Sequence, residues 1–436
     1  MGLTLICAPC AWAQSSLSLE DAFRLAAEHS TAIQLADSRV ATESVGLMEA
    51  RAEWLPSLSV SSSTSRNWGL QFDETTGSLV TRSRDFASFG ASTSWTVFDG
   101  FRRGHRIQAA ELGVQAQSAG AARARQEVMA EVLRRYLQVL VDTEQLRIRD
   151  GSLDIQRVQL DMISADVRMG SRPTSEQLTQ ENAVVQAESA LQSAESALEL
   201  SRAQLLHFLR LDPVGAYEFV VPERSADAET ESPENLGGLV DQALALRPDL
   251  ASAERLVEAA EMRLQVSRSA RLPALSLRAD SRTSYSSIAR DRVTGEPESF
   301  LDQLPENRAY SAGVSLSIPI LDRRQTRAAV DRGQIQIEEA QVQANALQRQ
   351  VELEVTEAWL QLRGAVRRAE TTERLLESAA GAVEVEETRY AVGAGSLLEL
   401  LIARSSLVTA SLERVQAVYE LEFRKRLLGF YVGRMP

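Results

Sequence analysis

Cysteine is nearly absent from this chain of 436 residues. Its two cysteines, Cys7 and Cys10, lie in an apolar stretch at the start that ends in Ala11-Trp12-Ala13. Small residues after such a stretch are typical of the cleavage site of a secretory signal peptide. We therefore expect residues 1–13 to be a signal peptide whose beginning lies upstream, and the exported chain to have no disulfide bond. The alternative is an unstructured cytosolic N-terminus.

Long apolar runs and blocks of basic residues are also missing. No stretch of about 18 apolar residues is present, which excludes a transmembrane helix, so a role in a membrane would require β-strands. The net charge is −13, and no cluster of Lys or Arg stands out. The chain therefore lacks the basic face that a nucleic-acid-binding protein needs.

Residue groups that carry out catalysis or bind metals are missing as well. The sequence contains no phosphate-binding loop, no His-x-x-x-His pair and no nucleophile next to a base. We expect no enzymatic activity, no cofactor and no bound metal. The three histidines are far apart in the sequence, at His29, His105 and His207.

What the sequence does contain is a long unit that occurs twice. The segment ARAEWLPSLSV, ending at Val60, parallels SRSARLPALSL, ending at Leu277, and further matching segments follow in the same order. A repeat of this kind decides the fold and has to be identified first. We predict a first repeat at 14–212, a linker rich in proline, glycine and acidic residues at 213–235, and a second repeat at 236–436.

In both repeats the spacing of apolar residues changes from helical to alternating at matching positions. Apolar residues at helical spacing predict a helix over 17–54, which Pro56 ends. Strands with one apolar face and one small, polar face follow, the pattern of a strand between lipid and water. Between the strands of each hairpin we expect a loop, at 66–85 and at 285–308. The four strands are predicted at about 57–66, 86–98, 273–285 and 309–320.

A very long helical stretch follows each hairpin. The two stretches, 101–169 and 323–392, would each extend roughly 100 Å at the usual rise of an α-helix. Each ends at a turn that contains glycine, after which a shorter helix returns from about Thr174 or about Leu397. The fold class is therefore mainly α with a membrane β-barrel part, and the unit of helix, β-hairpin, long helix and helix is duplicated.

Four strands are too few to close a barrel, and open strand edges are not tolerated in lipid. Three copies would supply twelve strands, enough to enclose a lumen, and their helices could close into a second tube. We therefore predict a homotrimer with a 12-stranded β-barrel and a long α-helical barrel.

The duplicated segments resemble the TolC-type outer-membrane efflux family over essentially the whole chain after residue 13. They are Leu55-Pro56 and Leu272-Pro273 before a strand, VFDGFRR (97–103) and ILDRRQT (320–326) after one, and the two glycine turns. The resemblance implies a trimeric duct in the outer-membrane lipid of a Gram-negative cell that extends into the periplasm. It would passively conduct substrates from an inner-membrane pump, joined through a periplasmic adaptor (membrane fusion) protein, in an efflux pump or a type I secretion system.

The resemblance also implies that the glycine turns form the periplasmic tip, where the adaptor binds and the duct is gated. In this chain the family's gate arginine is replaced by Gly395 and an expected acid by Ile402, so the family's gate network is incomplete. For Glu176 and Glu399, the alternative role is that of solvated acids at the start of a helix. The residues predicted for the tip are Gly170, Glu176, Tyr390, Gly393, Gly395 and Glu399.

Aromatic residues gather at the strand ends. Trp95, Phe98 and Phe101, with Trp54 nearby, match the belt that barrels place at the membrane interface. The alternative is ordinary packing where strands meet helices.

A different interpretation of the whole chain is a periplasmic coiled-coil scaffold without a pore. The long helices alone would fit it, but the alternating strands and the expected signal peptide favour the duct. The sequence does not distinguish drug, metal and protein cargo.

Overall fold

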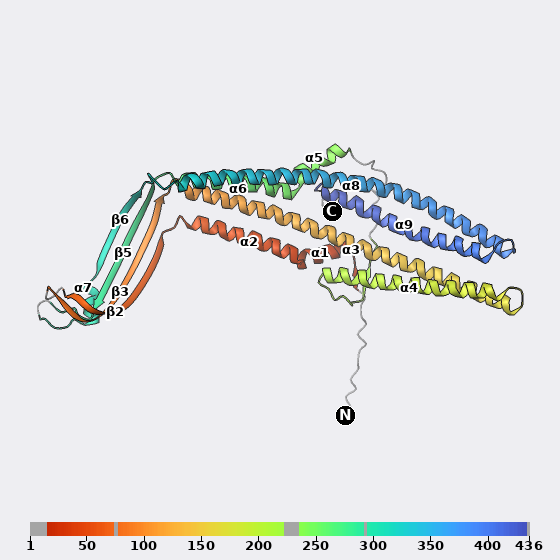
Figure 1. Cartoon of the computed structure of the whole chain (residues 1–436), viewed down its shortest axis with the longest axis horizontal. Coiled ribbons are helices and arrows are strands. Elements are labelled where there is room, and N and C mark those ends of the chain that lie inside the picture. Colours follow the sequence, from red (N-terminus) through yellow and green to blue (C-terminus); the bar gives the residue numbers. More distant parts are fainter. Residues whose placement is uncertain (1–14, 74–76, 222–234, 292–293, 434–436) are drawn as a thin grey trace, which may run out of the picture. The chain divides into compact units, whose positions relative to one another are not determined.

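The computed structural model describes residues 15–73, 77–221, 235–291 and 294–433. The expected signal peptide and residues 222–234 of the expected linker lie outside these ranges. The chain divides into two compact units, to which both halves of the sequence contribute (Figure 1). Unit 1 is formed from the described parts of 1–39, 118–252 and 345–436, and unit 2 from those of 40–117 and 253–344.

The two halves of the sequence form the same main elements in the same order. The long helices α3 and α8 both contain 67 residues, and the returning helices α4 and α9 both contain 35. The repetition therefore extends from the sequence to the backbone. In the first half the elements are α1 (Leu19–His29), α2 (Thr31–Ala52), β2 (Ser57–Asp73), β3 (Ser78–Phe98), α3 (Arg102–Arg168) and α4 (Thr174–Phe208). In the second half they are α5 (Leu236–Leu246), α6 (Pro248–Ser269), β5 (Ala274–Ser286), β6 (Ala309–Ser317), α8 (Gln325–Ala391) and α9 (Leu397–Tyr431).

Within the described ranges, none of these helices has an apolar stretch of the length that crossing a bilayer requires.

The structure corrects several of the sequence predictions. The helix predicted over 17–54 is interrupted at Ser30, whose extended backbone separates α1 from α2. The loop predicted at 66–85 is largely strand, because β2 and β3 stay paired as far as Asp73 and Ser78. The alternation of Trp68, Leu70 and Phe72 signalled this extension, but the glycines nearby obscured it.

Three short elements were not predicted. β1 (Ser15–Leu17) and β4 (Tyr217–Phe219) form a parallel two-stranded sheet, although they lie about 200 residues apart in the sequence. The helix α7 (Phe300–Glu306) lies within the loop predicted at 285–308. Such short segments carry too few residues for a period to be recognised.

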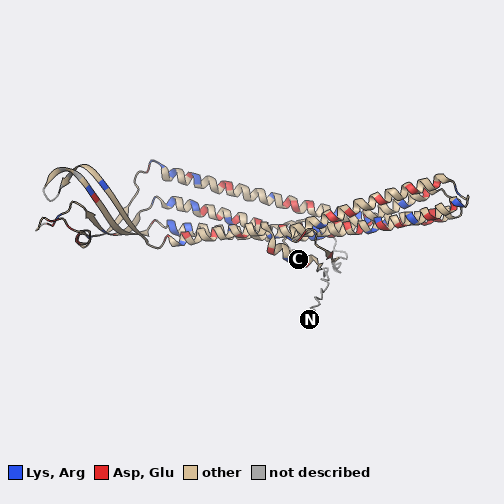
Figure 2. Ribbon diagram, turned by 90° about the horizontal axis from the view of Figure 1, so that it is seen from below, with Lys and Arg blue, Asp and Glu red and all other residues tan. Residues whose placement is uncertain are grey.

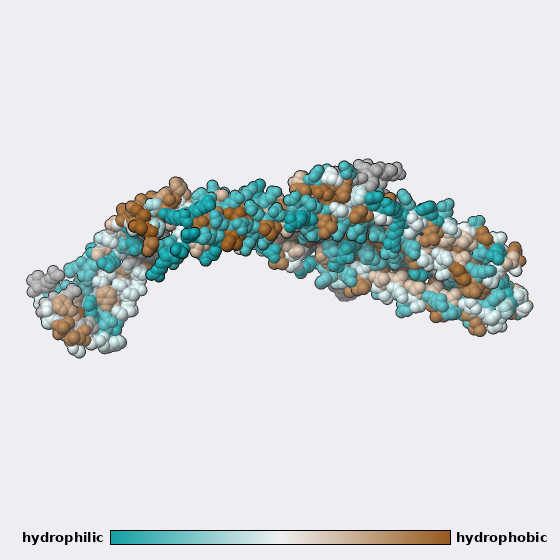
Figure 3. All heavy atoms as spheres, turned by 45° about the horizontal axis from the view of Figure 1, so that its top comes forward, coloured by the Kyte–Doolittle hydropathy of each residue, from teal (hydrophilic) through white to brown (hydrophobic). Residues whose placement is uncertain are grey.

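Unit 2 contains an antiparallel sheet with the strand order β2-β3-β5-β6 (Figure 1). Residues opposite each other in such a sheet point to the same face, so the register decides which side chains share a face. Most of the apolar residues of the four strands lie on one face, which also carries the Arg66–Asp85 ion pair, and most small or polar residues lie on the other, which also carries Phe86. The apolar face carries Leu58, Val60, Ala91, Trp95, Leu277, Ala279, Val314 and Leu316, and the other carries Ser59, Ser92, Arg278, Asp280 and Ser315. Figure 3 shows hydrophobic residues exposed on unit 2, including where the strands meet the long helices.

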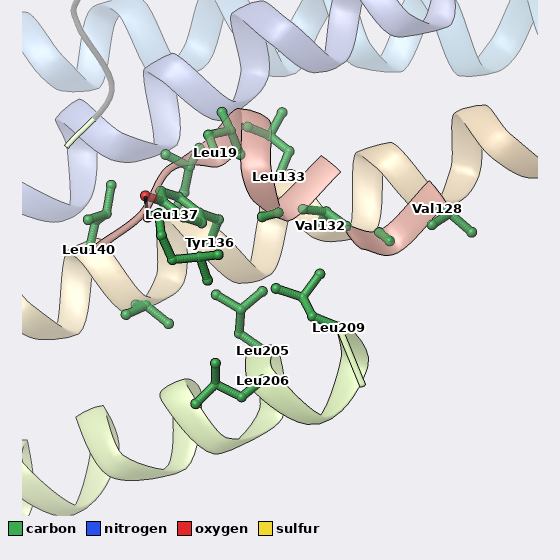
Figure 4. Close-up of a cluster of buried hydrophobic side chains, with 14 of the residues drawn as sticks. Leu19, Val128, Val132, Leu133, Tyr136, Leu137, Leu140, Leu205, Leu206 and Leu209 are labelled. Atoms are coloured by element: carbon green, nitrogen blue, oxygen red, sulfur yellow. Dashed lines mark hydrogen bonds between the residues drawn. The ribbon is translucent and has the colours of Figure 1, made fainter. Parts of the chain in front are cut away.

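The main core of unit 1 packs around Tyr136 of α3 (Figure 4). The Tyr136 ring is fully buried, and its hydroxyl lies 2.8 Å from the carbonyl oxygen of Leu17 and 2.6 Å from that of Val220. Burial raises the pKa of Tyr136 to about 12, so the hydroxyl keeps its proton for these carbonyl groups. This side chain therefore ties the ends of β1 and β4 to the long helix.

A buried ion pair stabilises the part of unit 1 formed by the second half of the sequence. Arg247, between α5 and α6, donates to the two carboxylate oxygens of Asp249 at 3.1 and 2.6 Å and to Glu354 of α8 at 2.7 Å. Burial alone would raise the pKa of Asp249, but the hydrogen bonds from Arg247 lower it below its usual 3.8. The pair fixes the α5–α6 junction against α8.

Replacing Asp249 with asparagine is expected to lower the unfolding free energy of the protein by about 2 kcal/mol at pH 7, the scale of a hydrogen bond to a charged group. Because folding lowers this pKa, the contribution is complete above 3.8 and is lost as the pH falls through the folded-state value. Urea unfolding at pH 7 and at pH 3 measures both effects. The control is Asp241→Asn, on the exposed side of α5; equal destabilisation by both variants would contradict the assignment.

Candidate functional site

The two glycine turns join antiparallel helices of unit 1, α3 to α4 and α8 to α9. Gly170 and Gly393 have φ angles of 79° and 75°, a left-handed conformation that favours glycine. Both are the residue that follows the helix end in a Schellman motif. The paired backbone hydrogen bonds run from Gly170 to Val167, Ser171 to Asp166, Gly393 to Tyr390 and Ala394 to Arg389. The repetition predicted for these turns therefore extends to their hydrogen bonds.

A polar cluster that the sequence analysis missed lies at the first turn, centred on Arg172. Its guanidinium donates to Asp166 Oδ2 at 3.0 Å, to Glu176 Oε2 at 2.9 Å and to the hydroxyl of Tyr390. It also lies over the Tyr390 ring, 4.3 Å from the ring centroid, in a cation–π contact. The Tyr390 hydroxyl in turn donates to Glu176 at 3.3 Å. Arg172 and Glu176 of the first helix pair are thus bound to Tyr390 of the second pair.

Apolar side chains lie beside this polar cluster. Ile163 of α3, Tyr390 of α8 and Leu397 and Leu400 of α9 are buried together, with Val167 partly buried against them. The contact between the two helix pairs is therefore a small hydrophobic cluster with an arginine-centred network at its edge.

Burial and charge act in opposite directions on the ionisable groups of the cluster. Burial would lower the pKa of Arg172, but hydrogen bonds with Glu176 and Asp166 and the charge interaction with Tyr390 raise it. Burial raises the pKa of Tyr390, against the opposing effect of the Arg172 charge. At neutral pH the cluster therefore holds a cation, and the tyrosine keeps the proton that it donates to Glu176.

The predicted residues at the second turn have a different role. Glu399 and Ser396 form a capping box at the start of α9, in which each side chain accepts a hydrogen bond from the other residue's backbone N–H group. Glu399 thus caps the start of α9, while Glu176, the matching acid of the first turn, binds Arg172. A side chain at Gly395 would meet Arg389, whose Cβ lies 3.1 Å from the position of an added Cβ.

Arg172 could have been found from the repeat itself. It lies two residues after Gly170, and Gly395 lies two residues after Gly393. The resemblance places the family's arginine at the second turn, whereas this chain carries an arginine at the matching position of the first. The structure brings Glu176 and Tyr390 together and leaves Glu399 and Gly395 out of the network.

The predicted aromatic residues of unit 2 form one group where β3 leads into α3. The indole N–H of Trp95 donates to the carbonyl oxygen of Trp54 at 2.9 Å. Phe98 and Phe101 are in edge-to-face contact, with their ring centroids 5.3 Å apart. Arg103 lies over the Trp54 ring, 4.1 Å from its centroid. All four aromatic side chains are exposed and lie near the end of the apolar face of the sheet.

In the described part of the chain, no group of three or more His, Cys, Asp or Glu residues could hold a metal ion. Acidic and basic residues alternate along the helices without a large patch of one sign (Figure 2). The arrangement at the turns is suited to holding helices together or to binding another helical surface.

Comparison with known proteins gives matches along nearly the whole chain. The model of the outer membrane efflux protein family matches residues 22–209 and again residues 239–433. The pyoverdine export outer membrane protein OpmQ of Pseudomonas aeruginosa is 28% identical over 383 residues, which cover 87% of this chain and 77% of OpmQ. The alkaline protease secretion protein AprF of the same organism is 25% identical over 436 residues, which cover 96% and 85% of the two chains. The crystal structure of the Campylobacter jejuni CmeC outer membrane channel superposes with a TM-score of 0.80 at 16% identity, covering 95% of this chain and 85% of CmeC.

The Arg172→Gln variant is expected to loosen the contact between the two helix pairs. Loss of its charged hydrogen bonds should speed amide hydrogen exchange at residues 390–400 about tenfold, which corresponds to about 1.4 kcal/mol of local stability. Arg168→Gln is the matched control, because Arg168 is an exposed neighbour with the same charge. Equal exchange in the two variants would contradict a holding role for Arg172.

Proposed function

Because this chain belongs to the outer membrane efflux protein family, we propose that it is the outer-membrane exit duct of a tripartite efflux pump or of a type I secretion system. The observation that carries this proposal is the four-stranded sheet with one apolar and one small, polar face. Such a sheet is suited to separate lipid from water. A coiled-coil scaffold without a pore would leave the apolar face of the sheet without a role.

We propose further that the duct is a homotrimer of a duplicated chain, with the repeats at 14–212 and 236–436 and the linker at 213–235. Three copies of the sheet would supply twelve strands for a closed β-barrel. Their long helices would form an α-helical barrel on the periplasmic side. In support of the duplication, the main helices of the two halves have equal lengths.

Transport through this duct would be passive. An inner-membrane pump, joined to the duct through a periplasmic adaptor protein, would supply the energy. The printed names of the relatives differ in cargo, pyoverdine for OpmQ and alkaline protease for AprF. A lumen lined by small, polar side chains discriminates little among solutes, so the cargo of this chain would be chosen by its pump.

The glycine turns would form the periplasmic tip, where the adaptor binds and the duct opens. Arg172, Tyr390 and Glu176 are the residues that would hold the two helix pairs together in the closed state. This network would replace the arginine that the family carries where this chain has Gly395. Glu399 would contribute by fixing the start of α9 at the tip.

The aromatic group at the end of β3 would lie at the membrane interface. Trp95, Phe98 and Phe101 are exposed, and amphipathic rings favour that boundary. Trp54 and Arg103 would hold the strand–helix junction at the same level.

Deleting the gene is the direct test of the proposed function. The deletion strain should become more sensitive to toxic compounds or should retain an exported protein inside the cell, and the intact gene should restore the normal behaviour. Unchanged resistance and unchanged secretion would argue against both forms of the duct.

The gate is tested on the purified protein in planar lipid bilayers. Arg172→Ala should raise the fraction of time spent open by up to about tenfold, because the closed state loses its charged contacts. Arg168→Ala should behave as the wild type. If Arg172→Ala also behaves as the wild type, the network does not hold the duct closed.

A further inference from the structure

The sheet of unit 2 has two unpaired edges. Among the described residues, β2 and β6 each pair with a single strand, and they lie at opposite ends of the sheet (Figure 1). Large side chains along these edges are unusually exposed: Leu58 and Trp68 at 76% and Tyr310 at 72%, and Leu321, just beyond the end of β6, at 94%. A strand edge with unpaired N–H and C=O groups and apolar neighbours is a template for pairing with another chain.

The duplication holds at the level of single hydrogen-bonded pairs. Ser57 and Ala274 begin β2 and β5 and lie 217 positions apart, while their partners Ser94 and Ser317 lie 223 positions apart. With these two shifts, each of the nine pairs of β5 with β6 repeats a pair of β2 with β3. The two hairpins therefore have one register, and the shifts convert positions of one repeat into positions of the other.

The pairing of β3 with β5 joins the first repeat to the second within the chain. Adding 223 to a position in β3 gives the matching position in β6, and subtracting 217 from a position in β5 gives the matching position in β2. Applied to the register of β3 with β5, these shifts give the pairing that would join the second repeat of one copy to the first repeat of the next. Thr93 opposite Ala279 becomes Leu316 opposite Ser62. We propose that β6 pairs antiparallel with β2 of a second copy of this chain in this register. The proposal rests on the proposed trimer and adds the residues that form its seam.

Side-chain chemistry supports this register. Leu316 and Ser62 both point to the apolar face, so that face continues from one copy to the next. The register also places Tyr310 opposite Trp68. The shift that the β3–β5 register makes between Thr96 and Phe98, carried over in the same way, would place Leu321, just beyond β6, opposite Leu58. These pairs bring together the exposed edge residues, and aromatic and apolar cross-strand pairs each contribute about 0.2–1 kcal/mol. A slip by one residue would place every apolar side chain of one strand beside the polar face of the other.

The proposed contact between β6 and β2 of two copies, here called the seam, cannot match the β3–β5 junction within the chain in every detail. Within the chain, Gly100 packs so closely on the second repeat that an added Cβ would lie 2.6 Å from the Cβ of Leu272. The matching residues at the seam are Arg323 and Leu55, and the arginine has a side chain where the internal junction has none. The helix ends must therefore lie further apart at the seam. Ile320 and Leu321, both more than nine-tenths exposed, are available to fill the added space.

Disulfide cross-linking tests the register in outer membranes. Within one chain, Ser62 and Leu316 are separated by two strands, roughly 14 Å across the sheet, which is too far for a disulfide. A bond between these positions must therefore join two copies. Because each copy carries both cysteines, Ser62→Cys with Leu316→Cys should give a covalent trimer after mild oxidation, and reductant should reverse it.

Two matched pairs test alternative registers. Ser61→Cys with Leu316→Cys represents a slip by one residue, and Thr64→Cys with Leu316→Cys a slip by two. Both should give at least about fivefold less cross-linked product, since their Cα atoms lie further apart or their side chains face opposite sides. The single-cysteine variants control for bonds through Cys7 or Cys10. A second pair on the predicted register, Trp68→Cys with Tyr310→Cys, covers the case in which the first does not assemble.

The outcomes distinguish a wrong register between the copies from a wrong number of copies. Equal or stronger cross-linking of a slipped pair, or none with either predicted pair, overturns the proposed register. Light scattering of the detergent-extracted wild type counts the chains independently. A mass of three chains with a wrong cross-linking pattern refutes the seam alone, whereas a mass of one chain refutes the proposed trimer.

Discussion

The constraint on which the structure depends is that backbone hydrogen-bonding groups cannot remain unpaired in lipid. The sheet of this outer-membrane efflux family member has an apolar face on all four strands, yet β2 and β6 each leave one edge open in the described chain. Burial of apolar area would favour almost any association. Hydrogen bonding is more selective, because only a strand with matching register and direction satisfies an open edge. In the proposed duct, closure of the barrel would set the number of copies, and the register would make the apolar face continuous.

Duplication provides a framework that the chain modifies locally. The strand registers, the helix lengths and the glycine turns agree between the halves, so these features are fixed by the shared architecture. The differences lie at the contacts: Arg172 follows the first glycine turn and Gly395 stands at the matching place in the second, and Gly100 is matched by Arg323 where strand passes into helix. At both places one half has a glycine where the other has an arginine. Such differences allow one repeat to make close contacts that the other cannot make.

Periodicity in the sequence was sufficient to predict the long helices, the four strands and their two faces, because each extends over many residues. It was insufficient for β1, β4 and α7, which are too short to show a period, and it missed the continuation of β2 through Trp68 to Phe72. At the glycine turns, the resemblance drew attention to Tyr390 and Glu176, which the structure brings into contact. The repeat could have identified Arg172, but its contact with Tyr390 could not be predicted, because the two residues lie 218 positions apart in the sequence and only the packing of the two helix pairs brings them together.

Both sheet edges are expected to be paired in the assembled protein. Amide hydrogen exchange in the detergent-extracted protein tests this most directly, because alternate N–H groups of an edge strand point away from the one strand that it pairs with in the described part of the chain. If the edges are paired, the outward-pointing amides of β2, over residues 61–69, and of β6 exchange as slowly as those of β3 and β5. Rapid exchange at those edge amides, with β3 and β5 still protected, would contradict it.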